Sequence, residues 1–376
     1  DYDDPDTYRM LSQGETEGVF QLESTGMKQV LVGLQPKNLE DVIALISLYR
    51  PGPMDSIPTY LRNRHEPDKI SYKTPQLAHI LDVTNGCIVY QEQVMQIFRE
   101  LAGFSFGQAD NVRRAMSKKK HAVMEAEREH FVHGCTEPGH ECPGCVANGI
   151  SEKVANEIYD EMSSFASYAF NKSHAACYAY VAFQTAYLKC HYPSEFMAAL
   201  LTSVLDNTDK VIEYSGECAR LGIKVLPPDI NISNGGFTAD NGQIRFGLNA
   251  VKNVGRNLIE QVVKERVGHP YTSLYDFCKR MHGNELNRRA VECLIKAGAF
   301  DSMGENRRSL VEAVDGVIKS VESDARKNLD GQLDLFSVMS GGAESTAEDV
   351  YEIKHLEEYT HTELLQQEKE VSGLYL

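Results

Sequence analysis

Apolar residues recur at helical spacing through most of the chain, and proline or glycine interrupts the pattern at intervals. In NLEDVIALISLYRPGPM, residues 38–54, the apolar positions between Val42 and Leu48 cover one face, and Pro51 then stops the helix. VYQEQVMQIFRELAGF, residues 89–104, repeats this pattern. Both stretches predict amphipathic helices that bury one face.

Two further helices are expected downstream. SEKVANEIYDEMSSFASYAF, residues 151–170, opens with Ser151, which is a suitable N-cap. A longer helix is predicted from about Ser173 to Tyr192, where Pro193 ends it. Its many alanines predict close packing against neighbouring helices.

The pattern changes near residue 226. Short apolar runs lie on both sides of Asn241-Gly242, and this dipeptide between alternating runs is the strongest short signal for a β-hairpin. Helices are expected again from about 249 to 321, followed by a polar linker over 322–350. VSGLYL, residues 371–376, is expected to form a strand. The predicted fold class is therefore mainly α with a small β-hairpin.

Composition narrows the class of protein. With 376 residues, 42% of them hydrophobic and 24% charged, the chain is expected to fold into two or three globular domains. No apolar stretch approaches the ~20 residues of a membrane helix, and no signal peptide is recognised, so no membrane partner is expected. The nine cysteines are odd in number and scattered, which favours a reducing cytoplasm over a disulfide framework.

The net charge of −16 argues against a protein that coats nucleic acid indiscriminately. The charge is uneven, because residues 331–376 hold ten acids against two bases. Half of the negative excess therefore lies in this last stretch, and a locally basic surface elsewhere is compatible with the total.

NVRRAMSKKK, residues 111–120, is the densest basic stretch. On a helix, Arg114 and Lys118 lie four residues apart on one face, with Arg113 about 100° away. A solvated basic turn is one interpretation. A phosphate site is the other, because adjacent arginines can clamp phosphate oxygens with fork geometry.

FNKSHAACY, residues 170–178, is a second candidate anion site. Ser173 is expected to cap the long helix, which puts Lys172 and His174 beside its N-terminus. Free N–H groups, the positive end of the helix dipole and a lysine together favour an anion. An ordinary capped helix with a surface histidine is the alternative, although two such basic sites in one helical domain strengthen each other.

HGCTEPGHECPGC, residues 133–145, has the spacing of a metal loop. Cys135, His140, Cys142 and Cys145 form C-x4-H-x-C-x2-C, with His133 as a substitute for His140. Four such ligands in a short loop suit tetrahedral Zn²⁺, and a closed site of this kind is structural. A three-cysteine loop without metal is the alternative.

GLNAVKNVGRNLIEQVVKER, residues 247–266, predicts two helices joined by a tight turn. Asn253 and Gly255 tolerate the left-handed backbone that such a turn needs. Lys252 and Arg256 flank the turn, so its backbone N–H groups are candidates to hold a DNA phosphate without reading the base sequence.

A second hairpin of this type is expected in LNRRAVECLIKAGAF, residues 286–300, with Gly298 at its turn. Ordinary helix turns look similar to either copy alone. The two in tandem indicate a DNA-binding helix-hairpin-helix region.

The residues do not supply an evident reaction centre. Nucleotidyl transfer by two metals needs converging carboxylates, and the early acidic cluster DYDDPD, residues 1–6, looks like a loop and helix cap. Neither a phosphate loop of the G-x-x-x-x-G-K-[ST] type nor a G-x-S-x-G elbow occurs. The chemistry alone thus predicts phosphate binding without catalysis.

Several motifs resemble one family. They closely resemble the fingers region of the C family of bacterial replicative DNA polymerases, the polymerase III alpha subunits. The motifs are TEGVFQLES (16–24), LYRPGPM (48–54), VYQEQVMQI (89–97), NVRRAMSKKK (111–120), FNKSHAACYAY (170–180) and LKCHYPSEFMAALLT (188–202). The similarity continues through LPPDIN, the hairpin pair and the final GLYL, so it covers essentially the whole chain.

The resemblance implies a DNA-directed DNA polymerase as the parent protein. Its expected partners are template-primer DNA, deoxynucleoside triphosphates (dNTPs), the sliding clamp and other replicase subunits. Arg113 and Arg114 match the triphosphate-contacting arginines of the family, and the other basic residues fall in its nucleotide-proximal segments. The implied nucleotide-binding set is Arg113, Arg114, Lys118, Lys172, Ser173 and His174.

The resemblance also implies where catalysis lies. The catalytic aspartates and their Mg²⁺ belong to the palm domain of the family, which precedes the first residue here. The chain alone is therefore expected to be a catalytically inactive fragment.

QLDLF, residues 332–336, resembles the pentapeptide that binds the sliding clamp. Gln332 would hydrogen-bond at a pocket rim while Leu335 and Phe336 fill an apolar cleft, with roughly micromolar affinity because the peptide is ordered on binding. Packing of these side chains on their own domain is the alternative. The implied clamp-binding set is Gln332, Leu333, Asp334, Leu335 and Phe336.

The implied domain order starts with fingers over 1–225, which include a Cys/His-rich insertion at 133–149. The β-hairpin and tandem helix-hairpin-helix domain follow over 226–321, then the clamp-binding linker over 322–350, and the start of an OB-like domain over 351–376. Many relatives have a short connection in place of the insertion, so the zinc prediction rests on spacing alone. Two other function classes compete: a non-enzymatic DNA- and clamp-binding module, and a zinc-containing repair enzyme, against which the missing catalytic acid argues.

Overall fold

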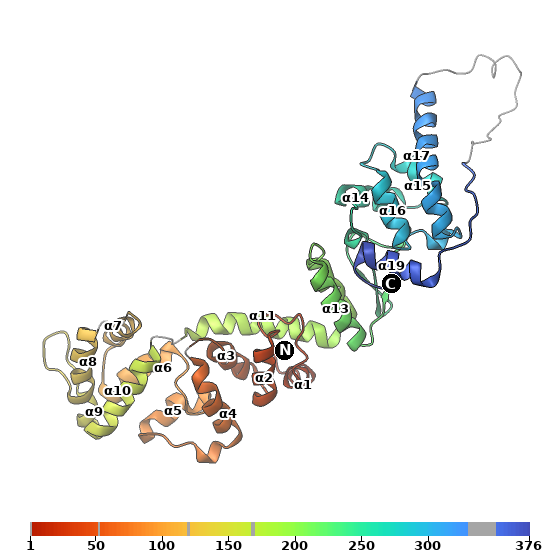
Figure 1. Cartoon of the computed structure of the whole chain (residues 1–376). Helices are drawn as coiled ribbons and strands as arrows, with labels where there is room; N and C mark the ends of the chain where they lie inside the picture. Colours follow the sequence, from red (N-terminus) through yellow and green to blue (C-terminus); the bar gives the residue numbers. More distant parts are fainter. Residues whose placement is uncertain (1, 52, 119–120, 167–169, 330–350) are drawn as a thin grey trace, which may run out of the picture. The chain divides into compact units, whose positions relative to one another are not determined.

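The computed structural model describes residues 2–51, 53–118, 121–166, 170–329 and 351–376. The chain divides into two compact units, Asp1–His191 and Tyr192–Leu376 (Figure 1). Helices dominate the described residues and one small sheet accompanies them, which confirms the mainly α class. This division falls after residue 191, whereas the sequence puts a domain boundary at residue 225, which stays a prediction. None of the described helices is long and apolar enough to cross a bilayer.

The first unit contains all four helices that the hydrophobic pattern predicts before residue 192, as α3, α6, α10 and α11. Its helices are α1 (Pro5–Ser12), α2 (Thr25–Leu34), α3 (Leu39–Leu48), α4 (Ile57–His65), α5 (Ala78–Leu81), α6 (Gln91–Ala102), α7 (Phe106–Ser117), α8 (His121–His133), α9 (Gly144–Ala147), α10 (Glu152–Ala166) and α11 (Lys172–His191).

Two apolar cores stabilise the first unit. In one, α11 packs against α3 and α1 through Ala175, Ala179, Ala182 and Ala186, which are each 0% exposed. Short side chains let the helices approach closely, as the alanine content predicts. The other core joins α6, α7, α8 and α10 around Phe98, whose ring contacts those of two further core aromatics edge-on.

Helix caps agree with the sequence at one helix and differ at another. Ser151 caps α10, since its Oγ accepts the Val154 N–H at 3.4 Å. The expected cap of α11 is wrong: Asn171 Oδ1 accepts the His174 N–H at 2.9 Å, and Ser173 lies exposed in the first turn. Asparagine is at least as good an N-cap as serine, and the cap accepts from the N–H three residues later, which places it at 171.

The second unit begins with two helices, continues through the sheet and ends in a helical region. Its elements are α12 (Pro193–Ser203), α13 (Thr208–Arg220), β1 (Val225–Leu226), β2 (Thr238–Asp240), β3 (Gln243–Arg245), α14 (Arg256–Glu265), α15 (Leu274–Met281), α16 (Arg288–Lys296), α17 (Arg307–Leu329) and α19 (His361–Ser372).

The predicted hairpin is confirmed. Strands β2 and β3 pair antiparallel with Asp240 opposite Gln243, and Asn241 (φ 50°) and Gly242 (φ 78°) form the turn between them. Both turn residues have the positive φ that Asn-Gly favours. The sequence missed β1, which pairs parallel with β3 and gives the order β1-β3-β2.

The end of the second unit differs from the sequence-based expectation in two places. Helix α17 continues to Leu329, so the first residues of the expected linker are helical; ESDARKNL, 322–329, contains neither glycine nor proline to stop the helix. The strand expected over 371–376 is wrong, because α19 extends to Ser372. Gly373 then ends this helix with φ 82°, its N–H donating to the Lys369 carbonyl.

A buried ion network holds α19 against the unit. Arg307, with a side chain 9% exposed, lies 2.7 Å from Asp301 and 2.9 Å from Glu368, whose side chain is 7% exposed. Glu358 accepts the N–H groups of Arg307 and Arg308 at 2.8 and 3.1 Å and thereby caps α17. The segment after residue 350 is therefore anchored to the helix that precedes residue 330.

Candidate functional site

The two adjacent arginines of α7 have different environments. Arg113 is 18% exposed and donates to Asp110 Oδ1 at 2.7 and 3.0 Å and to Gln91 Oε1 at 3.1 Å. Arg114 is 64% exposed and pairs with Asp110 Oδ2 at 2.7 Å. The hydrogen bond from Arg113 is the main cause that lowers the pKa of Asp110. Arg113 is thus fixed in place, whereas Arg114 and the exposed Lys118 at the end of the helix face solvent.

The N-terminus of α11 already holds a carboxylate of its own chain. Both Glu92 oxygens lie 3.2 Å from the Lys172 N–H, and one also accepts from the Asn171 side-chain amide at 2.8 Å. Lys172 Nζ pairs with Glu40 at 2.9 Å and lies 5.3 Å from the Tyr90 ring centroid. The helix end therefore has the geometry of an anion site, in which Glu92 is the anion.

One cleft of about 510 Å³ brings the two basic stretches together. Gln91, Glu92, Asp110, Arg113 and Asn171 are among its lining residues. Arg113 of α7 and Asn171, the N-cap residue of α11, consequently line the same space, together with Gln91 and Glu92 at the start of α6.

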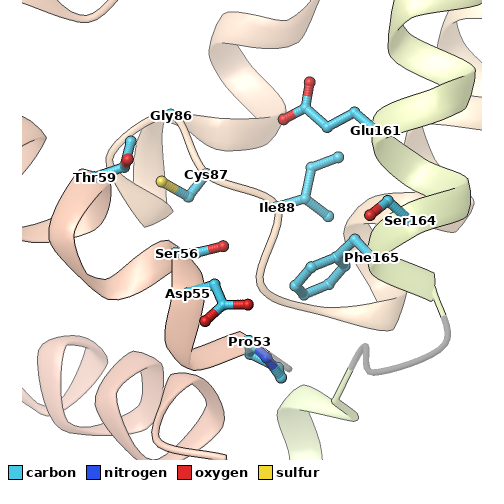
Figure 2. A pocket seen from close by; sticks show the side chains of 10 residues that line it. All are labelled: Pro53, Asp55, Ser56, Thr59, Gly86, Cys87, Ile88, Glu161, Ser164 and Phe165. Atoms are coloured by element: carbon cyan, nitrogen blue, oxygen red, sulfur yellow. The ribbon is translucent and has the colours of Figure 1, made fainter. Parts of the chain in front are cut away.

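Another cavity of the first unit lacks the arginines that, as Arg99 and Arg113, accompany the three carboxylates of the first cleft. Figure 2 shows Asp55 and Glu161 in its wall, with hydroxyl groups of Ser56, Thr59 and Ser164 beside them. No lysine or arginine is among the described residues that line it, so a phosphate would meet two carboxylates there. The cleft at Arg113 is the better candidate for a nucleotide.

Aromatic rings continue from the N-terminus of α11 along one side of the helix. The ring centroids of Phe170 and His174 lie 5.2 Å apart, those of His174 and Tyr178 4.6 Å, and those of Tyr178 and Phe20 5.5 Å. The guanidinium of Arg50 lies 3.6 Å from the Phe170 centroid. Planar groups of this kind are surfaces on which nucleobases stack.

The cysteine loop forms the tight turns that its sequence predicts. Cys135 and Cys142 exchange two backbone hydrogen bonds of 2.9 Å, and Gly134, Gly139 and Gly144 have positive φ. A Cβ on Gly144 would lie 2.3 Å from the Gly134 nitrogen, so the two strands of the loop approach as closely as glycine allows.

The four predicted zinc ligands are only partly brought together. Burial raises the pKa of the Cys145 thiol to about 12 and that of Cys142 as well, and Cys142 interacts electrostatically with both Cys135 and Cys145. His140 is exposed, and no three ligand atoms of the loop lie within 4.8 Å of one another. The zinc site stays a prediction.

The first predicted helix-hairpin-helix is shorter than expected, because a single 3-10 turn, Leu248–Ala250, stands in place of its first helix. Asn253 has φ 63°, whereas Gly255 has φ −75° and is the N-cap of α14, which receives no side-chain cap hydrogen bond. Lys252 and Arg256 are exposed on either side, and Arg256 pairs with Asp206 at 2.7 Å. An open helix N-terminus with flanking cations fits a phosphate.

The second predicted hairpin has a different environment. Gly298 has φ 86°, is buried, and donates its N–H to the Ile295 carbonyl at 2.8 Å. A Cβ at this position would lie 2.4 Å from Arg307 Nη2, so the glycine is needed for packing. This geometry does not favour the predicted DNA contact at Gly298.

The predicted clamp-binding peptide cannot be placed in the structure, because Gln332 to Phe336 lie outside the described residues.

Among the described residues, three metal-ligating side chains gather within 4.8 Å of one another at Asp4, Cys190 and His191. One of these ligands is a thiol, and Mg²⁺ prefers oxygen ligands, so this group does not fit the metal of a polymerase.

The sequence reading missed several residues of the cleft. Asp110 had a readable signal, because it lies three and four residues before the arginines, the spacing at which helical side chains pair. Asn171 carried a cap signal. Glu92 carried none, since it meets Lys172 across 80 residues of chain.

The comparisons with known proteins agree on one family. Residues 1–139 match the bacterial DNA polymerase III alpha subunit finger domain, and residues 222–310 match a helix-hairpin-helix motif. The chain is 45% identical to the DNA polymerase III subunit alpha of Thermus aquaticus over 100% of its length, and 42% and 41% identical to those of Bacillus subtilis and Escherichia coli. It spans 30% to 32% of the length of these relatives. The chain therefore belongs to the DNA polymerase III alpha subunit family, as a segment that comprises a finger domain and a helix-hairpin-helix region.

Proposed function

We propose that this chain is the part of a replicative DNA-directed DNA polymerase that binds the incoming deoxynucleoside triphosphate, template-primer DNA and the sliding clamp. The observation that carries the proposal is the cleft between α6, α7 and the start of α11. Arg113 and Asn171, the N-cap residue of α11, line it, and the row of aromatic rings begins at Phe170, next to Asn171 in the chain. The arginine and the helix N-terminus suit the negatively charged phosphates, and the aromatic rings suit the base.

In this proposal the polyanionic triphosphate competes with the carboxylates of the chain. Arg114 and Lys118 reach the phosphates from the exposed side of α7, and Arg113 fixes Asp110, which orients both guanidinium groups. At the other wall, a phosphate oxygen replaces Glu92 at the N-terminus of α11, beside the Lys172 side chain. His174 then offers its ring to the base or sugar.

We further propose that the open N-terminus of α14 grips a DNA backbone phosphate. Lys252, Asn253, Gly255 and Arg256 are all exposed there, which a sequence-independent contact requires. Residues 332–336 remain the proposed clamp-binding peptide. The catalytic carboxylates and Mg²⁺ are proposed to belong to the palm of the parent enzyme, so that the chain alone is inactive.

Titration calorimetry of the chain with a deoxynucleoside triphosphate tests the nucleotide site. We expect saturable binding that inorganic triphosphate displaces and that high salt weakens. Absence of binding in low salt would contradict the nucleotide proposal. Primer extension by the chain alone separates the parent activity from a purely DNA- and clamp-binding module: we expect none, and extension that survives repurification would disprove the proposed inactivity.

Duplex binding measured against salt concentration tests the DNA site. Arg256→Ala should reduce the salt slope by about one and weaken binding to all sequences alike. Arg308→Ala is a matched control, because Arg308 is also an exposed arginine of the second unit and lies on α17, outside both predicted hairpins. Equal effects of the two variants would remove the α14 N-terminus from the interface.

A further inference from the structure

A carboxylate, a thiol and an imidazole converge in the first unit, away from the cleft described above. The Asp4 carboxylate, the Cys190 sulfur and a ring nitrogen of His191 lie within 4.8 Å of one another. Asp4 is the N-cap of α1, and Cys190 and His191 are the last two residues of α11. His191 Nε2 and Asp4 Oδ2 lie 2.9 Å apart across 187 residues of chain.

Helix capping explains only part of this arrangement. Asp4 Oδ2 accepts hydrogen bonds from the Thr7 N–H at 2.8 Å and from the Thr7 hydroxyl at 2.6 Å, as expected of an N-cap residue. The pair with His191 adds an ion pair to that cap when the imidazole is protonated. Neither role needs a thiol beside the same carboxylate, and Cys190 is the group that turns the pair into a set of three ligands.

We propose that Asp4, Cys190 and His191 bind a zinc ion. Nitrogen, sulfur and oxygen from three different residue types are the donors that Zn²⁺ takes in proteins, and soft thiolate ligation disfavours Mg²⁺ and Ca²⁺. Thr7 orients the carboxylate, and the Tyr187 ring packs against the imidazole with centroids 4.4 Å apart. Such outer contacts fix first-shell ligands in place.

The electrostatic surroundings suit a cation. Asp3 and Asp6 flank the Asp4 ligand in sequence, and the one base in α1, Arg9, pairs with Asp6. Binding replaces the Asp4–His191 hydrogen bond with two metal–ligand bonds and releases the proton of the Cys190 thiol to solvent. The ion would link the start of the first unit to the last turn of α11, in place of the Asp4–His191 hydrogen bond that joins them without it. Three protein ligands leave a fourth position for water.

The zinc link predicts a metal-dependent reactivity of one cysteine in the unaltered chain. The chain, freed of metal by a chelator, is alkylated with iodoacetamide with and without Zn²⁺, and each cysteine is followed by mass spectrometry. Cys190 should react at least about tenfold more slowly with Zn²⁺, because a bound thiolate is not free to attack. Cys177, an exposed thiol on the same helix, is the internal control and should react at an unchanged rate.

Variants then test the ligand set by cobalt absorption. Compared with the unaltered chain, Cys190→Ala, His191→Asn and Asp4→Asn should each show a weaker thiolate–Co²⁺ charge-transfer band, by the intensity that one bound Co²⁺ contributes. Cys177→Ala should show an unchanged band. Asp4→Asn keeps the cap, since asparagine caps as well as aspartate, and it removes only the charged ligand. The thiols of the 133–145 loop are present in every variant, so their contribution cancels.

Protection of Cys190 by Zn²⁺ together with a loss of intensity in all three ligand variants would support the site. Equal alkylation with and without Zn²⁺ would overturn it. A loss of intensity in Cys190→Ala alone would also overturn it, since a lone thiol and not the set of three would then hold the cobalt.

Discussion

Arg113 and Arg114 are neighbours in sequence, yet the structure predicts different consequences for their removal. Arg113→Ala deletes a mostly buried fork that makes three hydrogen bonds to Asp110 and Gln91. Hydrogen bonds to charged groups contribute about 1.5–3 kcal/mol each when buried, and partial exposure and the loss of several at once leave a cost of roughly 1–3 kcal/mol in the free energy of unfolding.

Arg114→Ala removes a side chain that is 64% exposed and has one ion pair. The free energy of unfolding should therefore change by less than about 0.5 kcal/mol. Triphosphate affinity should fall by about 1.5–3 kcal/mol, or roughly 10- to 150-fold, because a charged hydrogen bond to a phosphate is lost. We therefore expect Arg113 to hold the site in place and Arg114 to bind the ligand.

Two measurements on each variant separate these roles. Urea unfolding followed by far-UV circular dichroism gives the free energy of unfolding, and calorimetry with a deoxynucleoside triphosphate gives the affinity. Arg288→Ala, an arginine of similar exposure in the second unit, controls for the loss of one positive charge. Unchanged triphosphate affinity in Arg114→Ala would refute the assignment of this arginine, and equal stability of both variants would refute the structural distinction.

Lowering the pH should reduce the stability that the hydrogen bond between Asp110 and Arg113 gives to the same site. The pKa of Asp110 is lowered below its ordinary value, chiefly by the hydrogen bond from Arg113. A carboxyl group with a depressed pKa contributes stability that is present above its unfolded pKa of about 3.9 and is lost as the pH falls through the folded pKa. Asp110→Asn should remove this part of the pH dependence of the free energy of unfolding, which urea unfolding at a series of pH values measures. The same pH dependence below pH 4 in the variant and in the unaltered chain would contradict the prediction.

Three further predictions concern the rest of the chain. Arg307→Met should lower the free energy of unfolding by about 3–5 kcal/mol because Glu368, 7% exposed, is left buried without its ion-pair partner; adding Glu368→Gln should restore part of it, and urea unfolding of the second unit measures both. Elemental analysis should find about one zinc per chain less in Cys145→Ser than in the unaltered chain, because the 133–145 loop is expected to bind one zinc in addition to the ion proposed at Asp4, Cys190 and His191; equal zinc contents would argue against the loop. Calorimetric titration into the cognate sliding clamp should show roughly micromolar binding that Gln332→Ala with Phe336→Ala abolishes, whereas equal binding by both proteins would move the contact elsewhere.

Local signals were sufficient wherever the relevant partners are close in sequence. The helical period placed α3, α6, α10 and α11, and Asn241-Gly242 fixed the register of β2 and β3, because these features depend on hydrogen bonds between near neighbours. The sequence analysis missed Asp110, although the same reasoning would have placed it one turn before its arginines. Local patterns gave a wrong prediction where the pattern was short: residues 371–376 suggested a strand, but helix α19 extends to Ser372.

The mainly α class, the basic stretches of α7 and α11, and the motifs that carry the polymerase resemblance can all be read from the amino-acid sequence. Which charges meet depends instead on how the helices pack. This packing put Glu92 on the N-terminus of α11, buried Gly298 beneath Arg307, and brought Asp4 to Cys190 and His191. The physical reason is that helix periodicity and caps depend on residues within about one turn, whereas these contacts depend on how whole helices pack their apolar faces, which no local pattern records.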